Sequence, residues 1–163
     1  MTGFEPGLLD KLFDDDVRGP TTSVLRLHTL DEMKNAVARD LEALLNTRMV
    51  FTDQALAAFP ECSRSVATYG LNDFSGLSLA SHYDRQFICS ALESAIARHE
   101  PRLCNVSVAL EVDRQPSTQV LFFGITALLR LPNLREPVNF DAMLQPTTLQ
   151  YAVSRGAGKG RFA

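Results

Sequence analysis

The chain has 163 residues, of which 45% are hydrophobic and 21% are charged, and its formal net charge is −3. This length fits one domain, and the composition supplies enough apolar surface for a core. The mild acidity argues against a nucleic-acid partner. The longest nearly apolar run, residues 120–129, is about half of the ~20 residues that a membrane-spanning helix needs, so we expect no direct membrane insertion.

The cysteines indicate the redox environment in which the protein works. There are three, an odd number, and no two have C-x-x-C spacing. This argues against a disulfide framework and against a zinc knuckle. The first residues lack the basic and apolar regions of a signal peptide. We therefore expect a cytoplasmic protein in a reducing environment.

Residues 1–28 are irregular, and we interpret them as an N-terminal docking segment. They contain a short apolar stripe at roughly helical spacing, followed by a run of aspartates, 14–16, that is typical of a solvated turn. A single α+β domain is predicted over residues 29–153, and a flexible C-terminal tail over residues 154–163.

The first firm helix is predicted near residues 31–46. Thr29 and Glu32 have the spacing of a capping box, which satisfies free amides at a helix start. One face of this helix is apolar, with Met33, Val37, Leu41 and Leu44 at its centre and Ala36 and Leu45 beside them.

Residues 47–80 are predicted to be a loop with short helical pieces, because they are rich in turn-forming residues. The loop nevertheless carries four large apolar side chains, Tyr69, Leu71, Phe74 and Leu77. We expect such a loop to be held against another part of the protein.

A second helix is predicted near residues 81–99. Ser81 and Asp84 form a cap-like pair at its start, and Pro101 disfavours helical geometry at the residue before it. The predicted apolar face consists of Phe87, Ile88, Ala91, Leu92, Ala95 and Ile96.

Beyond the second helix the apolar period changes from 3.6 to 2, which indicates strands. Residues 104–112 alternate, with Cys104 on the apolar phase. Residues 119–131 are apolar on both phases, which predicts a central strand covered on both faces, by the N-terminal segment or by a partner chain. Two shorter strands are predicted at 138–144 and 148–153. Helices followed by strands indicate an α+β fold with N-terminal helices on a small, mostly antiparallel sheet.

Residues suited to catalysis are few. The glycine-rich run at 156–160 lacks the spacing of a phosphate-binding loop. Cys89 with His82, or Cys104 with His99, could supply a nucleophile and a base. Both cysteines, however, fall on or beside apolar faces, where buried free cysteine is the commoner case. The histidines have no metal-ligand pattern, and no cofactor is expected.

A glycoside hydrolase needs two carboxylates at a groove, one of them with a raised pKa. Glu100, Glu111 and Asp113 lie near one another in the sequence. Glu111 and Asp113 share the polar phase of their strand beside a turn, where they are expected to be solvated. Hydrolysis is therefore disfavoured.

The joint between the second helix and the first strand reads Glu100-Pro101-Arg102. In extended chain, residues 100 and 102 point to the same side. One hypothesis is an internal clamp in which Arg102 binds a helix carboxylate such as Asp40. The other is a docking site for a partner. Spacing alone does not decide between them.

Five segments occur in the order seen in one known family. They are FEPGLLDKL near the start, RDLEALLNTR at 39–48, YGLNDFSGLS at 69–78, HEPRL at 99–103 and VNFDAML at 138–144. In this order they resemble TssE, a baseplate subunit of bacterial type VI secretion systems. TssE is similar to the sheath-initiator wedge protein of contractile phage tails.

The resemblance implies a structural protein without enzymatic activity and a strand-sharing fold like that of the sheath proteins. It implies wedge partners TssF, TssG and TssK, and initiation of the sheath by strand addition to TssB and TssC. The hub of VgrG and Hcp is a further candidate partner. The family's Glu-Pro-Arg motif, associated with anchoring to the TssF–TssG core, maps onto Glu100, Pro101 and Arg102.

These expectations leave two alternatives for function. One is a lysozyme-like hydrolase that cleaves peptidoglycan, and the other is a baseplate protein of a related phage-like injection machine. Tyr69 and Phe74 in the 69–78 loop are predicted as a second partner contact. On the docking hypothesis, Arg102→Glu is expected to release the wedge while leaving the fold intact.

Overall fold

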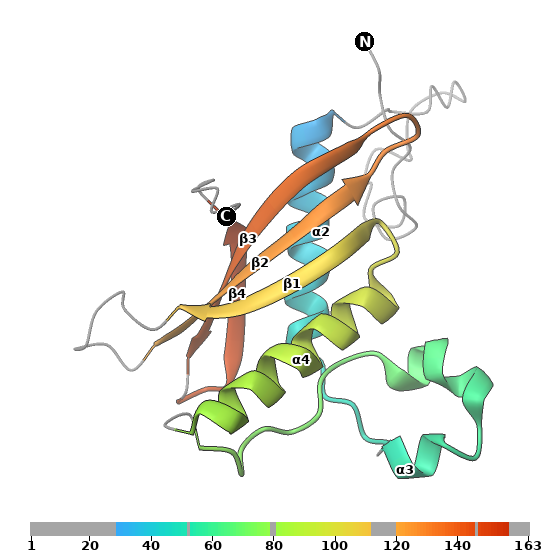
Figure 1. Ribbon diagram of the computed structural model, residues 1–163, viewed down its shortest axis with the longest axis vertical. Helices are drawn as coiled ribbons and strands as arrows, with labels where there is room; N and C mark the ends of the chain where they lie inside the picture. The colour runs from blue at the N-terminus through green and yellow to red at the C-terminus, as the bar shows by residue number, and fades with distance from the viewer. Residues whose placement is uncertain (1–28, 52, 79–80, 112–119, 146, 157–163) are drawn as a thin grey trace, which may run out of the picture.

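The computed structural model describes residues 29–51, 53–78, 81–111, 120–145 and 147–156, shown in colour in Figure 1. Two long helices precede a four-stranded antiparallel sheet, so the predicted α+β class is confirmed. The predicted N-terminal docking segment and most of the predicted tail lie outside the described residues.

Helix α2 (Leu30–Asn46) begins where the capping box predicts. The Thr29 hydroxyl accepts a hydrogen bond from the Glu32 amide at 3.2 Å, and the Glu32 carboxylate accepts one from the Thr29 amide at 2.7 Å. Two amides at the helix start are thus satisfied reciprocally. The helix buries one face, made of Ala36, Val37, Ala38, Leu41, Leu44 and Leu45.

The segment between the long helices contains three short pieces, α3 (Asp53–Leu56), η1 (Pro60–Arg64) and η2 (Val66–Thr68). It is fixed to the end of α2 at Leu71, which is 2% exposed. The Leu71 amide donates to the Thr47 carbonyl at 2.9 Å, and the Met49 amide donates to the Leu71 carbonyl at 2.9 Å. The prediction that this loop is held against the protein is confirmed.

Helix α4 (His82–His99) is capped by Ser81, whose hydroxyl accepts from the Asp84 amide at 3.3 Å. Its buried face is narrower than predicted and consists of Ile88, Leu92, Ala95 and Ile96. The assignment of Phe87 to the core is wrong, because its side chain is 51% exposed. The sheet covers only one stripe of the helix, and Phe87 instead packs edge-on against Phe74 in the loop.

The sheet is a meander of β1 (Leu103–Glu111), β2 (Leu121–Arg130), β3 (Arg135–Gln145) and β4 (Gln150–Arg155), in that spatial order. Helix α4 packs along β1 and α2 along β4, so both helices cover the same sheet face (Figure 1). Strand β3 is longer than predicted. Strand β4 extends two residues past position 153, into the region predicted as tail.

A bulge in β1 corrects the predicted strand phase. Asn105 has a positive φ of 52°, and the pairing with β2 shifts between Cys104 and Ser107. An extra residue in a strand moves the residues before it to the other face. Leu103 therefore lies in the core at 3% exposure, whereas Cys104 lies on the opposite phase, with its thiol donating to the Leu128 carbonyl.

The described helices cover one face of β2 but not the other. Phe123, Ile125 and Leu129 are fully buried beneath the helices. On the other face Phe122 and Leu128 are only half-buried, and no described helix packs over them. The predicted covering of this second face by the N-terminal segment or by a partner stays a prediction.

Candidate partner-binding site

At the joint between α4 and β1, the side chain of Glu100 binds the residue two positions later, Arg102. Helix α4 ends there, and the Glu100 amide still donates to the Ile96 carbonyl at 2.8 Å. The Glu100 residue is 4% exposed, and one of its carboxylate oxygens accepts from Arg102 Nε at 2.7 Å and from the Arg102 amide at 3.2 Å. Its second oxygen accepts from Arg102 Nη2. Both oxygens of this buried carboxylate are thus occupied by one arginine.

Arg102 also reaches helix α2. Its Nη2 donates to Asp40 Oδ2 at 2.5 Å, so the internal contact considered from the sequence is present. We call Glu100, Arg102 and Asp40 the clamp. It joins the start of the sheet to the middle of a helix more than sixty positions earlier in the chain.

The clamp is strongly electrostatic. Burial opposes a charge on Arg102, but its hydrogen bonds and charge interactions with Glu100 and then Asp40 outweigh that effect and raise the pKa of the guanidinium. The Arg102 carbonyl in turn accepts from the Arg130 amide at 2.7 Å. Side chain and backbone at this position are therefore both fixed.

Part of the joint remains accessible. Pro101 is exposed, and the Arg102 side chain is 25% exposed. The Arg102 Nη1 group makes no hydrogen bond to any residue within the described ranges. A partner could contact the proline ring and this edge of the guanidinium without breaking the clamp. The predicted docking role of Glu100, Pro101 and Arg102 stays a prediction.

Tyr69 lies beside the clamp. Its ring packs edge-on against His99, with centroids 5.4 Å apart, and His99 Nε2 is 2.7 Å from the Thr68 carbonyl. Burial raises the pKa of Tyr69, and the charges of Asp40 and Glu100 raise it further. The structure therefore brings one of the two predicted loop residues next to the Glu-Pro-Arg motif.

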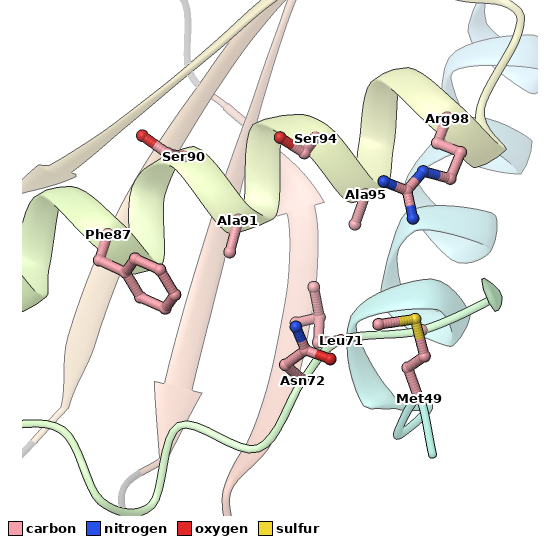
Figure 2. Close-up of a pocket in the computed structure, with 10 residues that line it drawn as sticks. Met49, Leu71, Asn72, Phe87, Ser90, Ala91, Ser94, Ala95 and Arg98 are labelled. Atoms are coloured by element: carbon pink, nitrogen blue, oxygen red, sulfur yellow. The ribbon is translucent and has the colours of Figure 1, made fainter. Parts of the chain in front are cut away.

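Phe74 lies elsewhere, in contact with Phe87 near the start of α4, with ring centroids 6.4 Å apart. Phe87 also lines a hollow of about 240 Å³ between α4 and the loop (Figure 2). Figure 2 shows Phe87 near one end of the hollow and Arg98 near the other, with Met49 and Leu71 opposite the helix. Sequence reasoning missed this hollow, because Phe87 fits the apolar face of a helix equally well.

Three of the side chains considered for catalysis have surroundings that do not favour it. Burial raises the pKa of the Cys89 thiol, which lowers its thiolate fraction at neutral pH. The Cys104 thiol donates to a backbone carbonyl, and His99 is bonded to Thr68. Asp113, one of the carboxylates considered for hydrolysis, lies outside the described residues, as does most of the 156–160 run.

The described part of the chain holds no group of three or more metal-ligating side chains. None of its helices is both long and apolar enough to cross a membrane.

Comparison with known proteins identifies the family of the chain. The family model "Baseplate wedge protein gp25" matches residues 31–133, which is more than half of the chain. The chain belongs to the gp25 family. Membership confirms the baseplate wedge assignment that the resemblance to TssE implied. The matched residues run from the start of α2 to the turn after β2 and include the whole clamp.

A solved structure is also similar to the chain. It is a chain of "The baseplate complex from the type VI secretion system", with 17% sequence identity and a TM-score of 0.47. The match covers 71% of this chain and 96% of that one. No curated protein matches the sequence.

Proposed function

We propose that this gp25-family chain is a TssE-type wedge subunit of a type VI secretion baseplate and that it acts by binding, without catalysis. The observation that carries the proposal is the family match across residues 31–133. The five sequence segments that resemble TssE support the type VI assignment. In this role the protein works in the cytoplasm, at a baseplate docked to the inner-membrane complex.

The docking surface for the TssF–TssG core is proposed at the exposed side of the clamp. A group held in one geometry before binding loses less conformational entropy when it binds. Glu100 and Asp40 hold the guanidinium of Arg102 in this way, and Pro101 beside it is exposed. Tyr69 extends the same surface from the loop.

A second contact is proposed at Phe74 and Phe87. Aromatic side chains beside a surface hollow are common anchors in protein interfaces. Phe87 lines the hollow between α4 and the loop, and its ring packs on that of Phe74. TssK is proposed as a further wedge partner, and the hub of VgrG and Hcp as a neighbour in the assembly.

The sheet is proposed to start the contractile sheath of TssB and TssC. In strand addition, the backbone groups of a sheet edge pair with an extended incoming segment. An antiparallel meander has two edge strands, here β1 and β4.

Co-purification tests the docking proposal. The tagged chain is co-expressed with TssF and TssG from the same source, beside a Pro101→Asp variant. The wild-type chain is expected to retain both partners. The variant is expected to retain at least about tenfold less of each, because an unpaired charge buried in the core of an interface is strongly unfavourable.

Thr148→Asp is the matched control, since it adds the same charge at an exposed residue in the β3–β4 turn, at the far end of the sheet. It is expected to retain both partners. If Pro101→Asp retains TssF and TssG as well as wild type does, the clamp only stabilises the fold and is not a docking site. Absence of both partners from the wild-type sample would contradict the type VI wedge assignment.

A related phage-like injection machine remains the second candidate, because the matching family is described as a baseplate wedge protein without reference to the machine. The same co-purification separates the two. Retention of wedge proteins of a phage-like tail, with no TssF or TssG, would favour it.

A further inference from the structure

The outer edge of β4 is occupied by side chains of α2. Along an edge strand, alternate residues direct their backbone groups away from the sheet. On β4 these include Tyr151 and Val153. The Tyr151 amide donates to Asn46 Oδ1 at 2.8 Å, and Asn46 Nδ2 donates to the Tyr151 carbonyl at 2.8 Å. The Val153 amide donates to Glu42 Oε2 at 2.8 Å.

The spacing of these contacts follows from the geometry of the two elements. Glu42 and Asn46 are four residues apart on the helix, a rise of about 6 Å. Tyr151 and Val153 are two residues apart on the strand, about 6.6 Å. One helical turn therefore matches one repeat of the strand edge, and both side chains reach their backbone groups together.

The Asn46 carboxamide imitates a neighbouring strand. It both donates to and accepts from the same residue, as two residues of a hydrogen-bonded antiparallel pair do. An extended segment adding to β4 would require the same two groups of Tyr151. It would also require the amide of Val153, which Glu42 now holds.

The opposite edge is closed in a related way. The Val108 amide of β1 donates to Glu93 Oε1 of α4 at 2.8 Å. Proteins protect sheet edges because an open edge pairs with other chains. In the described domain, each helix protects the edge strand beside it.

We propose that Glu42 and Asn46 form an edge clasp that keeps β4 closed, and that its release makes β4 an acceptor for an extended segment of a partner chain. The edge of β4 is the proposed acceptor because an open groove of about 370 Å³ lies beside it, lined by Asn35, Ala38, Arg39, Glu42, Val153, Ser154 and Arg155. Asn46 is also the last residue of α2 and is exposed, so its side chain can turn away without disturbing the buried face of the helix.

Release exchanges bonds one for one. The incoming backbone replaces the three hydrogen bonds of the clasp, and the freed side chains are solvated. The net change in free energy per hydrogen bond is small. A segment that pairs with more of the strand along the groove therefore binds more tightly. The clasp rests on the strand addition proposed above and adds the contact that controls it, and its test on the isolated chain can fail while the wedge assignment stands.

The test opens the clasp with the double variant Glu42→Ala/Asn46→Ala. Amide hydrogen exchange at Tyr151 and Val153 is expected to be at least about tenfold faster than in wild type at low protein concentration. Exchange at Val108 on the other edge should not change. At higher concentration the variant is expected to self-associate in light scattering, with a second copy supplying the added strand.

Adding Val153→Pro to the double variant distinguishes edge pairing from general stickiness. Proline removes the edge amide that an added strand would bind, and it is tolerated on edge strands. Self-association should then be lost. A double variant that stays monomeric with wild-type exchange at both amides would overturn the proposal, as would self-association unaffected by proline.

Circular dichroism checks that the double variant folds. If it does not, the single variant Asn46→Ala provides the test. Exchange is then expected to accelerate at Tyr151, while Val153, still held by Glu42, serves as an internal control. Unchanged exchange at Tyr151 would overturn the proposal in this form too.

Discussion

Arg102→Glu is expected to lower the free energy of unfolding by about 3–5 kcal/mol, the range for breaking a buried ion pair by removing one partner. The substitution leaves Glu100, 4% exposed, without the guanidinium that binds both of its oxygens. It also adds a third carboxylate beside Glu100 and Asp40. Urea unfolding followed by circular dichroism at neutral pH measures the loss.

The matched control removes the charges together. Asp40→Asn/Glu100→Met/Arg102→Met removes the charges and places apolar side chains at the two sequence-adjacent clamp positions, and replacement of a buried ion pair by apolar residues is often nearly neutral. It is expected to recover most of the stability lost in Arg102→Glu. The free energy of unfolding of Arg102→Glu could instead lie within about 1 kcal/mol of the wild-type value, as is typical when an exposed ion pair is broken. That result would show that the clamp is not a buried ion pair in solution.

This result bears on the docking hypothesis. From the sequence alone, charge reversal at Arg102 is expected to release a partner and leave the fold intact. The clamp geometry predicts instead that reversal damages the fold, so loss of partners in that variant would not identify a contact. Pro101→Asp avoids the difficulty, because Pro101 is exposed and takes no part in the clamp.

Gly70→Ala is the second large effect, an expected loss of about 2–3 kcal/mol from backbone strain together with steric overlap. Gly70 has a φ of +118°, which side chains rarely permit. A Cβ there would lie 2.6 Å from the Thr47 carbonyl oxygen, the acceptor that binds the Leu71 amide. The substitution therefore breaks the link between the loop and the end of α2.

Gly76→Ala is the control for this prediction. It lies in the same loop, and a Cβ there meets nothing within 4 Å. Its effect on urea unfolding is expected to be within about 0.5 kcal/mol, as for other surface substitutions. Hydrogen exchange at the Leu71 amide should accelerate only in Gly70→Ala. Equal stability of the two variants would contradict the proposed role of the Gly70 backbone.

Local sequence signals predicted the helices well. The capping box of Thr29 and Glu32 and the serine cap of α4 depend on residues three positions apart, so their spacing in the sequence is also their spacing in space. The two-residue period likewise predicted β1, and the run that is apolar on both phases predicted β2. Sequence reasoning reached the clamp only as one of two hypotheses, because its partner Asp40 is distant in sequence.

Other features depend on contacts that periodicity does not encode. The bulge at Asn105 changes the phase of β1 at one residue, which leaves no sign in the apolar pattern. Phe87 fits an apolar helix face, but the sheet does not extend over it. The edge clasp joins Glu42 and Asn46 of α2 to β4, more than one hundred positions away, so the local sequence pattern does not indicate it.

We propose that this gp25-family chain is the wedge subunit on which a type VI sheath starts. The most direct measurement follows fluorescent TssB in cells of the source organism from which this gene has been deleted. Extended sheaths are expected to disappear although TssB and TssC are still made, and wild-type chain supplied from a plasmid is expected to restore them. Sheaths that assemble at normal frequency in the deletion strain would contradict it.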